Sequence, residues 1–255
     1  MVNIDDEAFW SSDIEKISIP SGVQSIGNSA FLSCKNLTSV EIPLNSQLKS
    51  IGFDAFALTK IQEFFVPVNV TEIKARTFEY CLELKSIKYA DDSKLELIGS
   101  KAFYQTSINE MNIPKKVLNI EEEAFSCCYN LKSIYFCANS ELTYIGNNAF
   151  KGSTIEKIVF PSSLEIIGDF VFDYCGNITF VDFQANSNLF SIGKKFLSFS
   201  LIECIRIPPS INKLEYGCFY SCSNLSCIEF LGDEFYIEND DFCECTSLFL
   251  ISFPM

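Results

Sequence analysis

One unit of 22 to 25 residues recurs along the whole chain, and a phenylalanine marks the same place in nearly every copy. Residues 23–43, VQSIGNSAFLSCKNLTSVEIP, are a representative copy. The spacing of the markers alternates between 22 and 25 residues until a last interval of 23, so two units form a double repeat of 47 residues. The markers are Phe9, Phe31, Phe56, Phe78, Phe103, Phe125, Phe150, Phe172, Leu197, Phe219 and Phe242. A period of this length predicts a solenoid in which each unit forms one coil.

The unit also carries a resemblance. The pattern I-P-x-x-V-x-x-I-G-x-x-A-F-x-x-C-x-x-L occurs at residues 19–37 and again, with variation, at 113–131. It resembles the BspA-type leucine-rich repeat, a family of surface antigens of oral and gut bacteria that is expanded in parasitic protists. The resemblance covers essentially the whole chain. It implies a parallel-stranded solenoid used for attachment or other protein binding, and it implies no enzyme.

The end of each unit predicts a short strand, because apolar residues there lie two apart. We expect a β-rich solenoid, a right-handed leucine-rich repeat coil with one parallel sheet of about eleven strands on its concave face. Alternate residues, such as Val40 and Ile42, should point into the core. The predicted strands are residues 16–19, 39–42, 63–66, 86–89, 110–113, 133–136, 157–160, 180–183, 204–207, 227–230 and 250–253.

We interpret residues 1–255 as one domain, since no linker rich in Pro, Gly or Ser interrupts the repeats. The chain has 33 acidic and 19 basic residues, for a formal net charge of −14. Nucleic acids and anionic membranes need basic patches, so both are disfavoured as partners. No apolar run approaches the roughly 20 residues of a membrane span, so no membrane insertion is expected. The acidic excess is interpreted chiefly as keeping a Phe-rich chain soluble.

The first ten residues are acidic and already fit the repeat at Ile4, Ala8 and Phe9, so we expect no signal peptide in them. Without a secretory signal, the twelve cysteines are interpreted as reduced thiols of a cytoplasmic protein, with the cell surface as the alternative. Most of the thiols should be free. Cys204 and Cys227 share an outward position on neighbouring strands and form the pair expected to oxidise first.

Five cysteines recur at one position in every second coil, about 10 Å apart if coils stack at about 4.8 Å, which is too far for a disulfide. We interpret them as small buried apolar residues. These are Cys34, Cys81, Cys128, Cys175 and Cys222. Near the C-terminus, four cysteines from adjacent coils could meet and hold zinc. Their spacing matches no standard zinc motif, so we expect no metal. These four are Cys218, Cys222, Cys243 and Cys245.

The chain has no histidine, which removes Ser-His-Asp and Cys-His catalytic groups and imidazole acid–base chemistry. No phosphate-binding glycine motif occurs either. A third interpretation is an enzyme that uses only carboxylates, for which the acidic runs at residues 121–123 and 240–241 are the candidates. Both runs fall in predicted surface turns. We therefore expect no enzyme and no cofactor.

Two places depart from the regular repeat. Phe196-Leu197 stands where Ala-Phe is usual, so either the coil deforms or Phe196 points outward, and we favour a change in packing over a binding role. The chain also starts at Ile4 inside a coil and stops just after its last strand, without polar caps. Uncapped strand edges can pair, so we expect a homo-oligomer through one end, or instability without flanking sequence.

The remaining function is binding. Residues that alternate with the core positions should face the concave surface, where packing requires no aromatic residue. Aromatic anchors among charges are typical of a protein interface. The candidate partner-binding residues are Phe65, Lys88, Tyr135, Val159, Phe180 and Arg206. We expect a non-catalytic scaffold for another protein, such as a cytoskeletal or signalling partner; the alternative is a cell-surface adhesin for host or matrix proteins.

Overall fold

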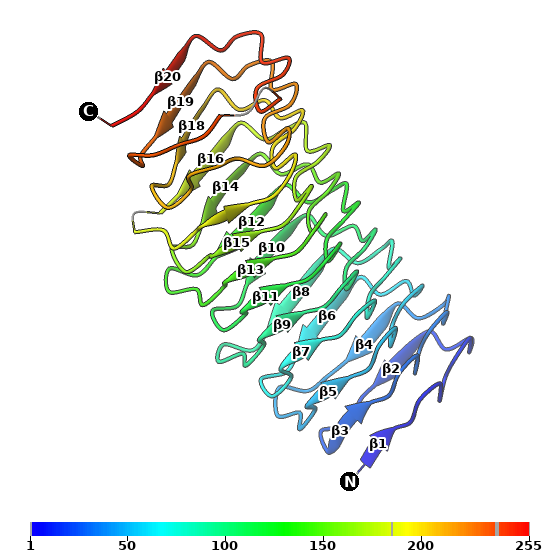
Figure 1. Ribbon diagram of the computed structural model, residues 1–255. Coiled ribbons are helices and arrows are strands. Elements are labelled where there is room, and N and C mark those ends of the chain that lie inside the picture. Colours follow the sequence, from blue (N-terminus) through cyan, green and yellow to red (C-terminus); the bar gives the residue numbers. More distant parts are fainter. Residues whose placement is uncertain (1, 185, 238–239, 255) are drawn as a thin grey trace.

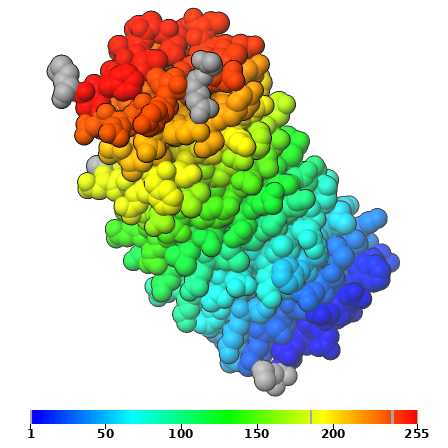
Figure 2. All heavy atoms as spheres, in the orientation of Figure 1, coloured from blue at the N-terminus to red at the C-terminus, as the bar shows by residue number. Residues whose placement is uncertain are grey.

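The computed structural model describes residues 2–184, 186–237 and 240–254, and shows them as one long solenoid (Figure 1). In these residues the regular structure consists of short strands and turns, with no helix. Figure 2 shows the sequence colours as successive bands along the long axis, so each coil packs mainly on the coils before and after it. Most coils have three sides: one strand from each of two sets and a turn segment between them.

The first set has eleven strands and confirms the predicted ones: eight have the expected bounds, and three end one residue earlier. They are β2 (Lys16–Ser18), β4 (Ser39–Glu41), β6 (Glu63–Val66), β8 (Ser86–Tyr89), β10 (Glu110–Ile113), β12 (Ser133–Phe136), β14 (Lys157–Phe160), β16 (Phe180–Phe183), β18 (Cys204–Ile207), β19 (Cys227–Phe230) and β20 (Leu250–Ser252). Burial alternates as expected, for example in β10 and β14. We call the outward side of this set the long-strand face.

Hydrogen bonding divides this set into four groups, β2–β4, β6–β8, β10–β16 and β18–β20. Strands that start 23 residues apart pair along their length. In the described residues, strands that start 24 apart show no paired register, except at Ser133 and Lys157 between β12 and β14. The expected single sheet is therefore interrupted, and the interruptions follow the 47-residue double repeat.

A second parallel sheet of nine strands lies on another side of the coil, and the sequence reasoning missed it. Its strands are β1 (Val2–Ile4), β3 (Val23–Ile26), β5 (Ser50–Ile51), β7 (Glu72–Ile73), β9 (Leu97–Ile98), β11 (Asn119–Ile120), β13 (Tyr144–Ile145), β15 (Ile166–Ile167) and β17 (Ser191–Ile192). Several end in Ile followed by Gly, because coils approach closely there. A Cβ on Gly52 would lie 2.4 Å from the backbone nitrogen of Asn28, so only glycine fits without a shift.

The turn segment around each marker residue forms the third side. Two residues in most coils have positive φ, such as Ser29 (φ 52) and Ser33 (φ 59). This conformation costs a non-glycine residue about 1 to 2 kcal/mol. Hydrogen bonds to the next coil offset the cost: the N–H of Phe31 donates to the carbonyl of Ala55 at 2.8 Å, and that of Ser33 to Ala57 at 2.9 Å. The turn side is thus as regular as the strands.

The marker phenylalanines form a continuous buried stack from Phe31 to Phe172, which Phe9 extends at the N-terminal side. Neighbouring rings lie 5.0 to 5.7 Å apart and nearly parallel. The stack stops at Leu197. Phe196 is fully buried there and meets the ring of Phe172 edge to face at 5.7 Å, so it points inward and not outward. The departure at this coil is a change in core packing, as favoured above.

A second buried column runs beside the rings, at the position three residues after each marker. Hydroxyl and thiol side chains alternate in it, and neighbours lie 3.3 to 3.5 Å apart where a contact is resolved. Each thiol also donates to a backbone carbonyl of the preceding coil, as Cys81 does to Phe56 at 3.1 Å. We call this the thiol–hydroxyl column: Ser12, Cys34, Thr59, Cys81, Thr106, Cys128, Ser153, Cys175, Ser200, Cys222 and Cys245.

Burial raises the pKa of three thiols in this column, Cys81, Cys128 and Cys175, to about 11. They are neutral and packed in the folded chain, which agrees with their interpretation as small core residues. Ten of the twelve cysteines are free in the structure.

Candidate functional site

The six candidate residues all lie on the long-strand face, one on each of six strands. Tyr135, Val159 and Phe180 are 52%, 44% and 45% exposed, so their side chains are available to a partner. Phe65 is half-buried.

The structure brings three of them together. Ser133 of β12 is the register partner of Lys157 of β14, and Tyr135 and Val159 each follow two residues later on the same outward side. Phe180 starts the next strand, β16, directly beside Lys157. Tyr135, Val159 and Phe180 therefore cover three successive coils, and we call them the apolar cluster.

Phe65 and Lys88 form a separate group. They are register partners on β6 and β8, and Phe65 lies three coils away from Tyr135, about 15 Å at the usual strand spacing. The Lys88 ammonium contacts the carboxylate of Glu63 at 2.6 Å. Both side chains of this ion pair are largely exposed, so it contributes little to stability.

Hollows open where the strands of the long-strand face are unpaired. The hollow between β16 and β18 measures about 520 Å³ and is lined by Phe180, Val181, Asp182, Cys204, Ile205, Arg206, Cys227 and Glu229. A second hollow of about 420 Å³ shares Asp182 and Arg206 with it and extends to the turn at 186–187. Further hollows lie between β4 and β6 and between β8 and β10. The hollow beside Phe180 adjoins the apolar cluster.

Charged groups border this hollow. Nε of Arg206 donates to the carboxylate of Glu229 at 2.8 Å across β18 and β19. Asp182 faces the hollow from β16, and no ion pair to it occurs among the described residues. The border thus carries an ion pair and one additional carboxylate.

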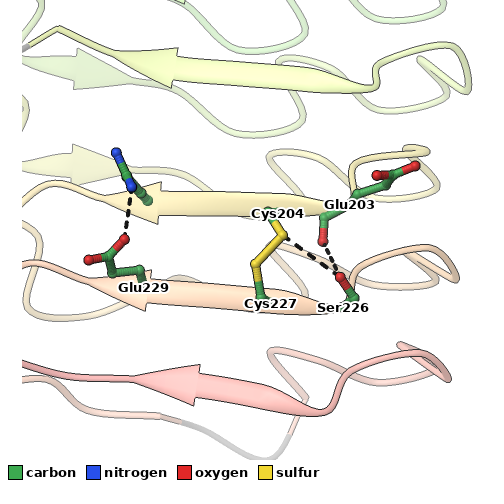
Figure 3. Close-up of a disulfide and its surroundings, with 6 residues drawn as sticks. Glu203, Cys204, Ser226, Cys227 and Glu229 are labelled. Carbon is green, nitrogen blue, oxygen red and sulfur yellow. Dashed lines mark hydrogen bonds and ion pairs between the residues drawn. A yellow bond between two sulfur atoms is a disulfide. The ribbon is translucent and has the colours of Figure 1, made fainter.

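A disulfide joins Cys204 to Cys227 on the wall of the hollow, with the two Cα atoms 4.7 Å apart (Figure 3). This is the pair expected to oxidise first. The Ser226 hydroxyl lies 3.8 Å from the Cys204 sulfur and donates to the Glu203 carbonyl at 3.0 Å. The cross-link fixes two neighbouring strands of the long-strand face to each other.

In the described part of the chain, no three His, Cys, Asp or Glu side chains are grouped so as to hold a metal ion. The four C-terminal cysteines considered for zinc do not converge: Cys218 is buried at the position that alanine usually occupies, and Cys243 is exposed. Cys222 and Cys245 continue the thiol–hydroxyl column. Within residues 2–184, 186–237 and 240–254, no helix is long and apolar enough to cross a membrane.

The sequence reasoning missed two features. Asp182 and Glu229 line the hollow beside Phe180, and the 24-residue spacing of strand starts was the signal that could have located it. Exposed aromatic rings also follow the turn side, where Tyr174 stacks on Phe199 at 5.7 Å and Lys151 lies over Tyr174 at 5.6 Å. The sequence feature that could have predicted these rings is an aromatic residue shortly after the marker position.

Comparisons with known proteins agree with this fold. The solenoid is similar to a leucine-rich repeat protein from Bacteroides ovatus, with 26% identity and a TM-score of 0.74 over 94% of this chain and 69% of that one. It is also similar to a T. pallidum leucine-rich repeat protein, with 26% identity and a TM-score of 0.53 over 59% of this chain and 69% of that one. A leucine-rich cell surface protein from Faecalibacterium prausnitzii shares the fold at 22% identity, with a TM-score of 0.50 over 98% of this chain and 82% of that one.

In a comparison with curated proteins, none matched the chain. The family profile described as "BspA type Leucine rich repeat region (6 copies)" matches residues 2–132, 49–179 and 143–255. These overlapping matches extend over nearly the whole sequence. The chain therefore belongs to the BspA-type leucine-rich repeat family.

Proposed function

We propose that this chain is a non-catalytic protein-binding scaffold whose partner contacts the long-strand face. The observation that carries the proposal is the apolar cluster of Tyr135, Val159 and Phe180 beside the hollow between β16 and β18. Apolar and aromatic anchors next to a pocket, with charges around them, are the usual make-up of a binding hot spot.

Arg206 and Asp182 supply the charged border of this site. Phe65 and Lys88 provide a second contact point on β6 and β8. From Phe65 on β6 to Arg206 on β18, the two points together span six coil spacings, or about 29 Å at the usual strand spacing. A standard protein interface of about 800 Å² on each partner is wide enough to cover both. One partner domain could therefore touch all six residues.

The test is quantitative recovery of partners from the source cells with single Ser variants at Tyr135 and Phe180. Each truncated anchor should cost about 2 kcal/mol, or about 30-fold in affinity. Tyr129→Ser is the matched control, because Tyr129 is also an exposed aromatic residue but lies on the turn side. Phe65→Ser should have a smaller effect. If the partners that Tyr129→Ser retains are recovered equally well with Tyr135 and Phe180 both changed, the long-strand face is not the site.

The cellular setting has two candidates. Ten free thiols fit a reducing cytoplasm and a cytoskeletal or signalling partner. The disulfide between Cys204 and Cys227 favours the other candidate, an adhesin at the cell surface, because exposed disulfides persist in oxidising compartments. Protease treatment of intact source cells separates the two: a surface protein is cleaved, whereas a cytoplasmic one is protected until the cells are lysed.

A second copy of the chain is a further proposed partner. The outer edges of β2 and β20 have no strand partner among the described residues, and such edges can pair. Light scattering at tens of micromolar tests this contact, which should give a concentration-dependent dimer. A constant monomer mass over that range would contradict it.

A further inference from the structure

The alternation of thiol and hydroxyl side chains in the thiol–hydroxyl column ends at its C-terminal side. In every earlier coil a cysteine has Ser or Thr as its neighbour in the adjoining coils, so no two thiols are adjacent in the column. Ser200 still precedes Cys222 in this way, at 3.3 Å. The next position is Cys245, not Ser or Thr. Two thiols therefore occupy adjacent coils.

Cys245 holds the regular column position. Its sulfur donates to the carbonyl of Phe219 at 3.0 Å, just as the Cys222 sulfur donates to that of Leu197 at 3.0 Å. Elsewhere in the column, a hydroxyl and the thiol 22 residues after it lie 3.3 to 3.5 Å apart. Cys222 and Cys245 are 23 residues apart, and their side chains contact each other. Adjacent coils also approach closely enough for a disulfide, whose Cα atoms lie about 4.4 to 6.8 Å apart.

We propose that Cys222 and Cys245 form a second disulfide when the folded chain meets a small-molecule disulfide such as oxidised glutathione. The bridge would close a segment of the chain and fasten the last coil to the one before it.

The two thiols differ in a way that sets the order of reaction. Cys245 is half-buried, whereas Cys222 is fully buried, so only Cys245 can be reached from solvent. The side-chain contact with Cys222 lowers the pKa of the Cys245 thiol, and the same contact raises the pKa of Cys222. Cys245 is therefore the thiol that ionises first and attacks.

The reaction balances in two exchange steps. The Cys245 thiolate attacks one sulfur of oxidised glutathione, the sulfur–sulfur bond breaks, and one glutathione thiolate leaves with the electron pair. Cys222 then attacks the Cys245 sulfur in the mixed disulfide, the bond between Cys245 and glutathione breaks, and the departing glutathione thiolate takes the proton of Cys222. Two protein thiols are oxidised to one disulfide, and one glutathione disulfide is reduced to two thiols.

The test treats the folded full-length chain with oxidised glutathione, quenches it with an alkylating reagent, and maps the peptides without reduction. We expect a peptide pair linked through Cys222 and Cys245, and a higher Tm than before oxidation. Cys245→Ser is the matched variant, because it restores the alternation of thiol and hydroxyl found in the earlier coils; it should lose both the linked pair and the rise in Tm. Cys243→Ser should retain both, which excludes the exposed neighbour Cys243 as the reacting thiol.

Two results would overturn the proposal. One is a lasting glutathione adduct on Cys245 with Cys222 still free, which would show that the buried thiol cannot reach it. The other is no reaction at Cys245 under conditions in which the exposed Cys243 is modified.

Discussion

The coils up to Phe172 form a first region and the coils from Phe196 onward a second. Both follow the same repeat, but the second departs from it at more positions. In the first region the ring stack is unbroken, hydroxyls and thiols alternate, and strand starts alternate between 23 and 24 residues apart. In the second, Leu197 interrupts the stack, two cysteines are adjacent in the column, and the last two strand intervals are both 23 residues.

The difference shows where the repeat tolerates change. Core positions of the first region are constrained from both sides by identical neighbours, since each coil packs only on the coils next to it. The second region has fewer identical neighbours. It contains the disulfide and the proposed Cys222–Cys245 pair, and the hollow beside Phe180 lies at the boundary between the two regions. Tyr135 and Val159 of the apolar cluster lie on regular coils, so the proposed binding site extends from the first region to this boundary.

The largest expected effect is a break in the ring stack. Phe103→Ala removes a fully buried ring from the middle of the first region and should lower the free energy of unfolding by about 3 to 5 kcal/mol. Urea unfolding, followed by circular dichroism, measures it.

The matched variant is the double exchange Phe196→Leu with Leu197→Phe, which places a phenylalanine at the marker position at constant total side-chain volume. It should change stability by less than about 1.5 kcal/mol. A loss as large as that of Phe103→Ala would mean that the second region is as strictly packed as the first.

A second prediction concerns alkaline pH. The thiols of Cys81, Cys128 and Cys175 ionise near pH 9 in the unfolded chain but only near 11 when folded, because burial disfavours the thiolate. Unfolding therefore releases protons between these values, and the stabilisation is complete below about pH 9 and is lost as the pH rises towards 11. Each thiol should account for on the order of 2 kcal/mol.

Urea unfolding at a series of pH values measures this loss. Cys81→Ser should reduce it by the contribution of one thiol, on the order of 2 kcal/mol. A serine hydroxyl does not ionise in this range and can donate to the Phe56 carbonyl as Thr59 does. An unchanged pH profile in that variant would rule out the buried thiol as its cause.

The smallest effects should come from the two exposed ion pairs of the long-strand face. Lys88→Gln and Arg206→Gln each remove one pair and should alter the free energy of unfolding by less than about 1 kcal/mol. Their effects on partner binding should differ, since Arg206 borders the hollow beside the apolar cluster and Lys88 does not. If Lys88→Gln and Arg206→Gln weakened partner binding equally, the hollow beside the apolar cluster would be no more important for binding than β6 and β8.

Much of the fold was predictable because it repeats. The marker phenylalanines determine the coil period, and the alternation in segments such as residues 110–113 and 157–160 predicts strands that the structure confirms. The second sheet was missed because its strands are mostly two residues long, too short for a period-two pattern to show. The interruptions of the first sheet were missed because they depend on one residue of spacing.

For the candidate site, the sequence could predict which residues face outward but not how those residues are grouped. Alternation identified which side chains face outward, including Tyr135, Val159 and Phe180. It could not show that these three lie together while Phe65 stands apart, since that follows from register. The hollow beside Phe180 depends on how β16 and β18 separate, which no local pattern encodes. The inward orientation of Phe196 likewise depends on the space that Leu197 leaves beside Phe172.

The direction of the hydrogen bonds has a mechanical consequence. On all three sides of the coil they run from one coil to the next, so a pull along the solenoid loads them in line and would peel coils away singly from an end. Each coil released would add about 80 Å of extended chain for its roughly 23 residues. Cys204 and Cys227 are 23 residues apart and covalently joined, so the segment between them cannot extend. Under tension, the solenoid should therefore extend coil by coil, except for the coil that the disulfide closes.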